Sequence, residues 1–168
     1  MSEPVYRPVT PDDVDFLWEM LVAAAAWDRP DSPFTTAEVR RIPDYAKYVE
    51  EWGRPGDHGI VAELDGETAG AAWLRRWNPE TAAFGFVAAD VPELIVGVRE
   101  AHRGQGLGSA LVRTLFDQAR AQGIATVSLS VEKANPALRL YERMGFEVVR
   151  DDPAAYVMTI DLLAPTYS

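Results

Sequence analysis

The sequence has no cysteine among its 168 residues, which excludes disulfide bonds, a cysteine nucleophile and metal sites with thiolate ligands. Histidine is scarce as well, because only His58 and His102 occur, far apart in the chain. A metal centre is therefore not expected.

Long apolar runs are also missing. The longest, Met20 to Trp27, is far shorter than the ~20 residues that a membrane-spanning helix needs. The residues Met1 to Pro4 lack the charged and then apolar pattern of a secretory signal. We therefore expect a cytoplasmic protein without a membrane partner.

Positive charge is in deficit, with 16 lysines and arginines against 26 aspartates and glutamates and a net charge of −10. Proteins bind nucleic acids mainly by neutralising phosphates with lysine and arginine, so a nucleic-acid partner is not expected. An acidic surface would instead attract a cationic acceptor. The length, and the lack of repeats, linkers and low-complexity runs, indicate a single domain over residues 1–168.

The chain is organised around a strand, a glycine-rich turn and a helix. Leu94 to Val98 is an apolar, partly β-branched run typical of a buried strand. Arg103 to Gly108 is the turn, and apolar residues recur at helical spacing from Leu111 to Ala119. Thr126 to Val131 then alternates apolar and polar residues, as a second strand does. Two strands joined through one helix form a right-handed βαβ unit.

Three glycines in the turn, Gly104, Gly106 and Gly108, allow the backbone to approach a ligand closely. The N–H groups and the dipole at the start of the helix then favour a phosphate. The alternative is a turn whose glycines only satisfy the backbone conformation. Two other phosphate loops are excluded, because the dinucleotide motif needs glycine where Ser109 stands and the Walker loop needs a lysine.

The turn Arg103-Gly104-Gln105-Gly106-Leu107-Gly108 resembles, in full, the pattern Gln/Arg-x-x-Gly-x-Gly/Ala of the GNAT family of N-acetyltransferases. The stretch Asn135 to Phe146 also resembles this family in its asparagine, its helical tyrosine and its Gly-Phe ending. The resemblance implies a layered α/β fold. It has a mixed, mostly antiparallel sheet of six to seven strands, a central splayed parallel pair and about four flanking helices.

The resemblance further implies acetyl-CoA as co-substrate and no metal. Its pyrophosphate would be held by the turn residues Arg103, Gly104, Gln105, Gly106, Leu107 and Gly108. Its pantetheine arm would bond to the backbone of Val96 and Val98, beside a bulge at Gly97, and would contact Asn135. Two alternatives stay open: Gly97 fits under a bulky side chain, and Asn135 only caps the helix that follows it.

The resemblance also implies catalytic roles. Tyr141 would protonate the departing thiolate, because a phenol and a thiol have similar pKa values; the alternative is a buried tyrosine with one hydrogen bond. Glu93 is the candidate base for the amine, with Glu63 and Asp90 behind it, and a solvated glutamate at the strand end is its alternative. The N–H of Val98 would stabilise the oxyanion.

Together these assignments predict transfer of an acetyl group from acetyl-CoA to a primary amine by direct attack in a ternary complex. The acceptor would be a small-molecule or peptide amine, and the resemblance allows a homodimer. Two rivals stay open: a non-catalytic acyl-CoA-binding or regulatory module of the same fold, and a nucleotide-binding protein of another α/β type. Three basic residues either meet the 3′-phosphate of CoA or are solvated: Lys133, Arg139 and Arg143.

The rest of the chain supplies further strands and helices. We expect strands at 5–9, 59–64, 68–77, 147–150 and 155–161, and helices at 10–26 and 36–52, the second interrupted near Pro43. A type I′ turn at Asp65-Gly66 joins two of these strands. Residues 78–91 are either a loop or a short extra hairpin. Five aromatic residues either line an acceptor pocket or pack in the core: Trp27, Trp73, Trp77, Phe84 and Phe86.

Overall fold

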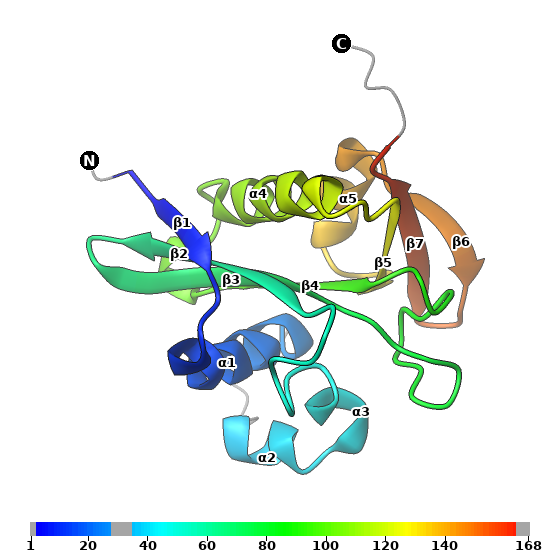
Figure 1. The fold of residues 1–168 in the computed structure, drawn as a ribbon, viewed down its shortest axis with the longest axis horizontal. Helices are drawn as coiled ribbons and strands as arrows, with labels where there is room; N and C mark the ends of the chain where they lie inside the picture. The colour runs from blue at the N-terminus through cyan, green and yellow to red at the C-terminus, as the bar shows by residue number, and fades with distance from the viewer. Residues whose placement is uncertain (1–2, 28–34, 164–168) are drawn as a thin grey trace. The chain divides into compact units, whose positions relative to one another are not determined.

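The computed structural model describes residues 3–27 and 35–163 (Figure 1). The strands are β1 (Val5–Pro8), β2 (His58–Leu64), β3 (Glu67–Arg75), β4 (Glu93–Val98), β5 (Thr126–Glu132), β6 (Glu147–Asp151) and β7 (Ala155–Asp161). The α-helices are α1 (Val14–Ala25), α2 (Thr36–Arg40), α3 (Pro43–Ala46), α4 (Leu107–Ala121) and α5 (Ala137–Met144). The short 3-10 helices are η1 (Pro11–Asp13) and η2 (Glu100–His102). Within the described ranges, no helix is both long and apolar enough to cross a bilayer.

The seven strands form one sheet in the order β1-β2-β3-β4-β5-β7-β6. β4 and β5 are parallel and register at Glu93 and Ser128, whereas β1–β2, β2–β3, β5–β7 and β6–β7 are antiparallel. The expected mixed, mostly antiparallel sheet with one parallel pair is confirmed. Five α-helices, rather than about four, are found in the described residues, because Pro43 divides the region 36–52 into α2 and α3.

The chain divides into two compact units. The first comprises residues 1–75 and 95–115, and the second comprises residues 76–94 and 116–168. Both β4 and α4 contribute residues to each unit. A single domain over the whole chain therefore stays a prediction.

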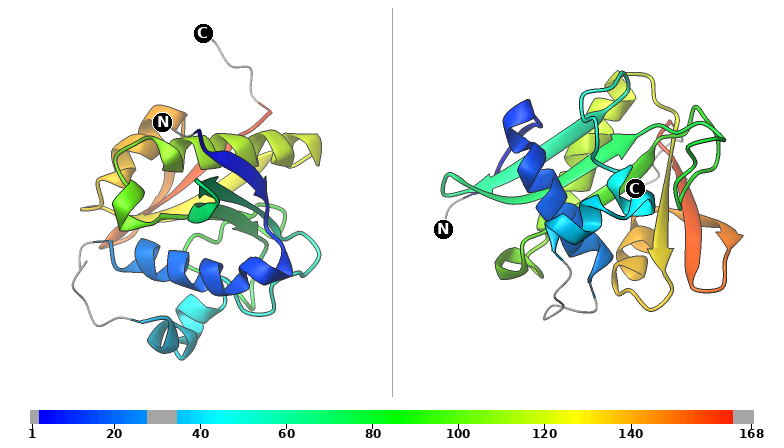
Figure 2. Two further views of the ribbon diagram at one scale, coloured as in Figure 1. Left: turned by 90° about the vertical axis from the view of Figure 1, so that its left-hand side faces the viewer. Right: turned by 90° about the horizontal axis from the view of Figure 1, so that it is seen from below.

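In the first unit, α1 to α3 lie on one face of the antiparallel strands and the start of α4 lies on the other face (Figures 1 and 2). Asp65 and Gly66 both have positive φ, 54° and 82°, which confirms the type I′ turn between β2 and β3. The helix expected over 10–26 begins as η1, because Thr10 and Asp13 form a capping box. The most buried side chains of this unit include Leu17, Ile60, Ala71, Trp73 and Leu111.

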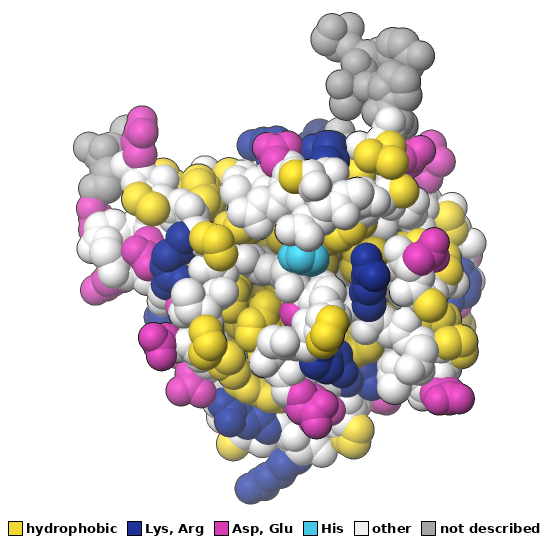
Figure 3. Space-filling view, viewed as in Figure 1, with side chains coloured by type: hydrophobic (Ala, Val, Ile, Leu, Met, Phe, Trp, Pro, Cys, Tyr) yellow, Lys and Arg dark blue, Asp and Glu magenta, His cyan; other side chains and the backbone are white. Residues whose placement is uncertain are grey.

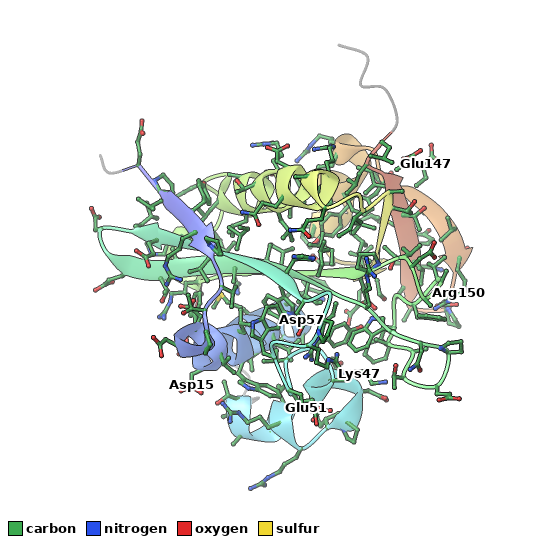
Figure 4. The ribbon with its side chains drawn as sticks, in the orientation of Figure 1. Asp15, Lys47, Glu51, Asp57, Glu147 and Arg150 are labelled. Atoms are coloured by element: carbon green, nitrogen blue, oxygen red, sulfur yellow. The ribbon has the colours of Figure 1, made fainter. Side chains whose placement is uncertain are left out.

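A buried ion pair ties the segment after α3 to the end of β3. Arg75 Nε donates to Asp57 Oδ1 at 3.1 Å, and the two side chains are 0% and 4% exposed. Arg75 Nη1 also donates to the carbonyl of Lys47 at 2.7 Å, and Figure 4 labels both Asp57 and Lys47 beside α3. Burial lowers the pKa of Arg75, and Asp57 opposes that shift. The pair fixes this connection, although buried ion pairs add little net stability.

In the second unit, β5, β7 and β6 form an antiparallel ladder, and α5 lies beside β5 (Figure 1). α5 ends at Gly145, whose φ of 106° gives a left-handed C-cap. Residues 78–91 contain neither a helix nor a strand, so they form a loop and the alternative of a short hairpin is wrong. The buried side chains of this unit include Phe116, Val127, Leu129, Tyr141, Phe146 and Met158.

Candidate functional site

The glycine-rich turn lies in the first unit, between β4 and α4. Gly104 and Gly106 have φ values of 78° and 80°, and a Cβ at either position would meet no atom within 4 Å. Both residues are exposed. The backbone conformation therefore requires glycine at both positions, and the space above this backbone is open to a ligand.

α4 begins directly after this turn, and Ala110 N donates to Gly106 O at 3.1 Å. The first N–H groups of any α-helix lack an acceptor within that helix. The first turn of α4 also contains no acidic residue. This helix start therefore fits a phosphate anion, whose charge the helix dipole favours.

Glycine is required less strictly at position 108 than at positions 104 and 106. A Cβ at this position would lie 3.7 Å from Val98 Cγ2, which is an ordinary contact, and its φ is outside the left-handed region. Neither the backbone nor the packing requires glycine here. The alternative in which the glycines only satisfy the backbone conformation is thus sufficient for Gly104 and Gly106 but does not explain Gly108.

The side chains of the turn take different environments. Arg103 is exposed, and its Nε donates to the carbonyl of Val98 at 3.1 Å, which ties the turn to the end of β4. Gln105 is exposed, whereas Leu107 is buried in the core. Arg103 therefore holds a positive charge close to the open backbone.

Gly97 marks a close approach between β4 and α1. A Cβ on Gly97 would lie 2.5 Å from the carbonyl oxygen of Met20 and 3.0 Å from its Cβ. Real Cβ atoms do not come this close to a backbone oxygen, so the glycine allows the helix to pack directly on the strand. The alternative stated from the sequence was a glycine beneath a bulky side chain. The space at Gly97 is indeed too small for a Cβ, but the nearest atom belongs to the backbone of α1.

The backbone of β4 alternates in direction as an extended strand does. Arg99 N donates to Ala69 O on β3 at 2.8 Å, and the carbonyl of Gly97 faces Gly70 of the same strand. If this alternation is unbroken, the N–H and C=O groups of Val96 and Val98 are directed away from β3, where a ligand could bond to them.

Tyr141 lies in the second unit, on α5, and is 9% exposed. Its ring meets the ring of Phe146 edge-on, with centroids 5.7 Å apart. Burial raises the pKa of Tyr141 to about 12. No hydrogen bond to its hydroxyl is formed by any residue within 3–27 or 35–163, so the alternative of a tyrosine fixed by one hydrogen bond gains no support.

Glu93, at the start of β4, also lies in the second unit. It is only 2% exposed, so the alternative of a solvated glutamate at a strand end is wrong. Its Oε1 accepts hydrogen bonds from Trp77 Nε1 at 3.1 Å and from Gly85 N at 3.0 Å. The two donors stabilise a carboxylate that burial alone would disfavour.

The two other candidate bases have different environments. Glu63 lies on β2 in the first unit, where it forms an ion pair with Arg7. Asp90 is exposed in the loop that precedes β4. Of the three candidate carboxylates, Glu93 is the one that is buried and held by two N–H donors.

Asn135 caps α5, because its Oδ1 accepts a hydrogen bond from Ala137 N at 2.9 Å. Its contact with a cofactor stays a prediction. Lys133 pairs with Asp151 at 2.5 Å and lies over the ring of Tyr156, so it is engaged within its own unit. The remaining basic candidates for a 3′-phosphate contact are exposed on α5: Arg139 and Arg143.

The aromatic residues fall into two groups. Trp73 and Trp77 are buried, and each indole N–H donates a hydrogen bond, from Trp73 to the carbonyl of Tyr48 at 2.9 Å. For these two the core alternative is supported. Phe84 is 46% exposed, whereas Trp27 and Phe86 are half-buried.

The predicted site residues are distributed over both units. The first unit holds Val96, Gly97, Val98 and the turn 103–108, and the second unit holds Glu93, Asn135 and Tyr141.

Sequence reasoning missed Ser128, which the alternation in β5 placed on a polar face. Ser128 is fully buried, and its Oγ donates to Gly85 O at 2.7 Å. No signal in the sequence marks this contact, because 43 residues separate the two partners. In the described ranges, no cluster of acidic and histidine side chains could hold a metal ion.

A family model described as the acetyltransferase (GNAT) family matches residues 16–146. A mycothiol acetyltransferase of Corynebacterium glutamicum is 32% identical over 147 residues, which cover 74% of this chain and 50% of that protein. An L-methionine sulfoximine/L-methionine sulfone acetyltransferase of Pseudomonas paraeruginosa is 36% identical over 90 residues, or 53% of this chain and 49% of that protein. The chain thus spans about half the length of these curated relatives.

Solved structures share the fold. The PaiA N-acetyltransferase of Thermoplasma acidophilum, solved in complex with coenzyme A, superposes with a TM-score of 0.72 and 17% sequence identity. The match covers 95% of this chain and 99% of that chain. At this identity the likeness shows the fold, which agrees with the mixed seven-stranded sheet described above.

Proposed function

The chain belongs to the acetyltransferase (GNAT) family, and we propose on this basis that it transfers the acetyl group of acetyl-CoA to a primary amine. The observation that carries the proposal is the open, glycine-built turn at the start of α4. The names of the two relatives, which refer to mycothiol and to L-methionine sulfoximine or sulfone, favour a small-molecule acceptor. Direct attack of this amine in a ternary complex is the expected route.

The residues of the first unit would bind the co-substrate. The N–H groups from Gly104 to Gly108 would hold its pyrophosphate, and Arg103 would add positive charge. The backbone groups of Val96 and Val98 would bond to its pantetheine arm, and the resemblance to the family adds a contact from Asn135. When bound, acetyl-CoA supplies an activated thioester, and no metal is needed.

The catalytic side chains would come from the second unit. Glu93 would accept a proton from the incoming ammonium group, directly or through water, because only the free amine attacks. Tyr141 would donate a hydrogen bond and then a proton to the departing sulfur. The resemblance to the family assigns the negative charge on the acyl oxygen to the N–H of Val98, which would stabilise it.

Calorimetric titration with acetyl-CoA tests the cofactor assignment. Gly106→Asp should bind acetyl-CoA about tenfold to 100-fold more weakly than Gly106→Asn, because only the aspartate places a negative charge against the pyrophosphate. The asparagine variant is the matched control, since Asp and Asn have the same size and both tolerate positive φ.

Equal binding by the aspartate and asparagine variants would show that the pyrophosphate does not bind at this turn. If neither acetyl-CoA nor CoA binds to the wild-type protein, the proposed activity fails. Binding without release of thiol in the presence of any amine would instead favour a non-catalytic acyl-CoA-binding module. NAD should not bind, because the dinucleotide motif is absent from the turn.

We further propose a cytoplasmic location, with neither nucleic acid nor a membrane as a partner. The net charge of −10 supports the first exclusion. A homodimer stays a prediction from the resemblance to the family. Sedimentation velocity at micromolar concentration measures it directly.

A further inference from the structure

In the loop between β3 and β4, two polar contacts involve Gly85 and two more involve its neighbours Phe84 and Phe86. Gly85 N donates to Glu93 Oε1 at 3.0 Å, and Gly85 O accepts from Ser128 Oγ at 2.7 Å. Arg150 on β6, labelled in Figure 4, donates to the carbonyls on both sides, at 3.0 Å to Phe84 O and at 3.4 Å to Phe86 O. The middle of a long loop is therefore fixed through its backbone.

The atoms packed around Gly85 leave no space for a side chain at this position. A Cβ on Gly85 would lie 2.7 Å from Glu93 Cδ and 2.9 Å from the carbonyl carbon of Leu129. Gly85 and Glu93 are both buried, and Glu93 registers with Ser128 across the parallel pair β4–β5. The Glu93 carboxyl group therefore has little freedom to move away from Gly85.

Trp77 supplies the second donor to the same oxygen. Its Nε1 lies 3.1 Å from Glu93 Oε1, and its side chain is buried. Two N–H groups on one carboxylate oxygen hold the ionised form of the acid and fix its direction. A buried carboxyl group with fewer donors would bind a proton more readily, because desolvation disfavours its charge.

We propose that Trp77 is a positioning residue for the proton acceptor Glu93. The N–H of Gly85, whose carbonyl is bound by Ser128, is the other donor, and we call these two donors the holder of Glu93. The inference rests on the proposed function, in which Glu93 takes a proton from the amine. The hydrogen bond from Trp77 holds the Glu93 carboxyl group in one direction, so that it is placed to receive that proton.

Two charged side chains near this loop are Arg150 on β6 and Asp152 directly after β6. Arg150 meets the loop through the carbonyls of Phe84 and Phe86, and Asp152 pairs with Arg150 at 3.0 Å. The contact from β5 is the neutral hydroxyl of Ser128. Neither Trp77→Phe nor Ser128→Ala changes any of these charges.

The first measurement is an NMR titration of protein labelled with carbon-13 in the glutamate carboxyl groups. Glu93→Gln identifies the Glu93 signal by its loss. In Trp77→Phe the titration midpoint of this signal should rise by about one pH unit, a tenfold gain in proton affinity, because one charge-assisted hydrogen bond is removed. Ser128→Ala should move it in the same direction by less, since the bond to Gly85 N remains.

Trp73→Phe is the matched control. Trp73 is equally buried and also donates one indole hydrogen bond, but to the carbonyl of Tyr48 in the first unit. Both tryptophan variants lose the same volume and one buried hydrogen bond, so their melting temperatures should fall by similar amounts. Of the two tryptophan variants, only Trp77→Phe should move the Glu93 midpoint.

The second measurement is the pH dependence of kcat/KM with acetyl-CoA and an amine acceptor. The acidic limb should move upward with the NMR midpoint in Trp77→Phe and stay in place in Trp73→Phe. An unmoved NMR midpoint in Trp77→Phe, or an equal shift in Trp73→Phe, overturns the inference. A wild-type rate in Glu93→Gln is a different failure, because it removes Glu93 from the proposed reaction while the NMR titration still reports the effect of Trp77.

Discussion

At the scale of single residues, burial decides how Tyr141 can act. From the sequence, a phenol near its ordinary pKa would match a thiol of about 8.5 closely. Burial raises the pKa of Tyr141 to about 12, which widens this gap. The neutral phenol therefore persists over the whole physiological range and always has a proton to donate, but it is a weaker acid than an exposed tyrosine. In the proposed reaction, a hydrogen bond to the departing sulfur would accordingly be its first contribution.

Tyr141→Phe tests this role. We expect kcat to fall by about 100-fold or more, which is the usual contribution of a positioned acid. Acetyl-CoA affinity should change little, because phenylalanine keeps the ring contact with Phe146. Steady-state rates from pH 6 to 10 provide the measurement, and the wild-type profile should show no loss of rate from Tyr141 in that range. An unchanged kcat would make this side chain purely structural.

At the scale of elements, two glycines near the turn differ in the space that an added Cβ would have. Gly97 allows α1 to approach β4, since a Cβ would lie 2.5 Å from Met20 O. Gly108 stands in the first turn of α4 with 3.7 Å to Val98 Cγ2. The packing of strand on helix therefore depends on the first glycine and not on the second.

Gly97→Ala and Gly108→Ala form a matched pair for denaturation in urea. Gly97→Ala should lower the free energy of unfolding by about 1–3 kcal/mol, because the added methyl group has no space. Gly108→Ala should leave it unchanged or raise it by up to about 1 kcal/mol, because alanine favours a helix. Equal effects of the two substitutions would contradict the close approach of α1 to β4.

At the scale of the whole molecule, we expect stability to depend on pH through specific carboxylates and not only through the net charge of −10. Acidic and basic side chains are interspersed on the face seen in Figure 3. Asp13, unlike these surface charges, is buried. Its carboxylate accepts two hydrogen bonds from Arg7 and one from Thr10 N. Arg7 lowers the pKa of Asp13 below its ordinary value.

The sign of the resulting pH dependence follows from this direction. A carboxylate whose folded pKa is lowered stabilises the protein at pH values above its unfolded pKa of about 4 and loses that contribution as the pH falls through the folded value. Asp13→Asn should therefore be less stable than wild type at pH 7, and the difference should shrink below about pH 4. Urea denaturation of both proteins from pH 7 to pH 3 measures it. A difference that does not depend on pH would show that the charge of Asp13 is unimportant.

The sequence by itself determined the order of strands and helices along the chain, the type I′ turn at Asp65-Gly66 and the glycine-rich turn 103–108 that precedes α4. These features follow from local periodicity and glycine conformation, which neighbouring residues report. Only the tertiary structure decided that Gly97 meets the backbone of Met20 and that Glu93 is buried against Trp77 and Gly85. In the first of these contacts 77 residues separate the partners, and no local pattern encodes which distant group fills the space beside a strand. The sequence could therefore supply the candidate residues, whereas packing decided which of their side chains are buried and hydrogen-bonded.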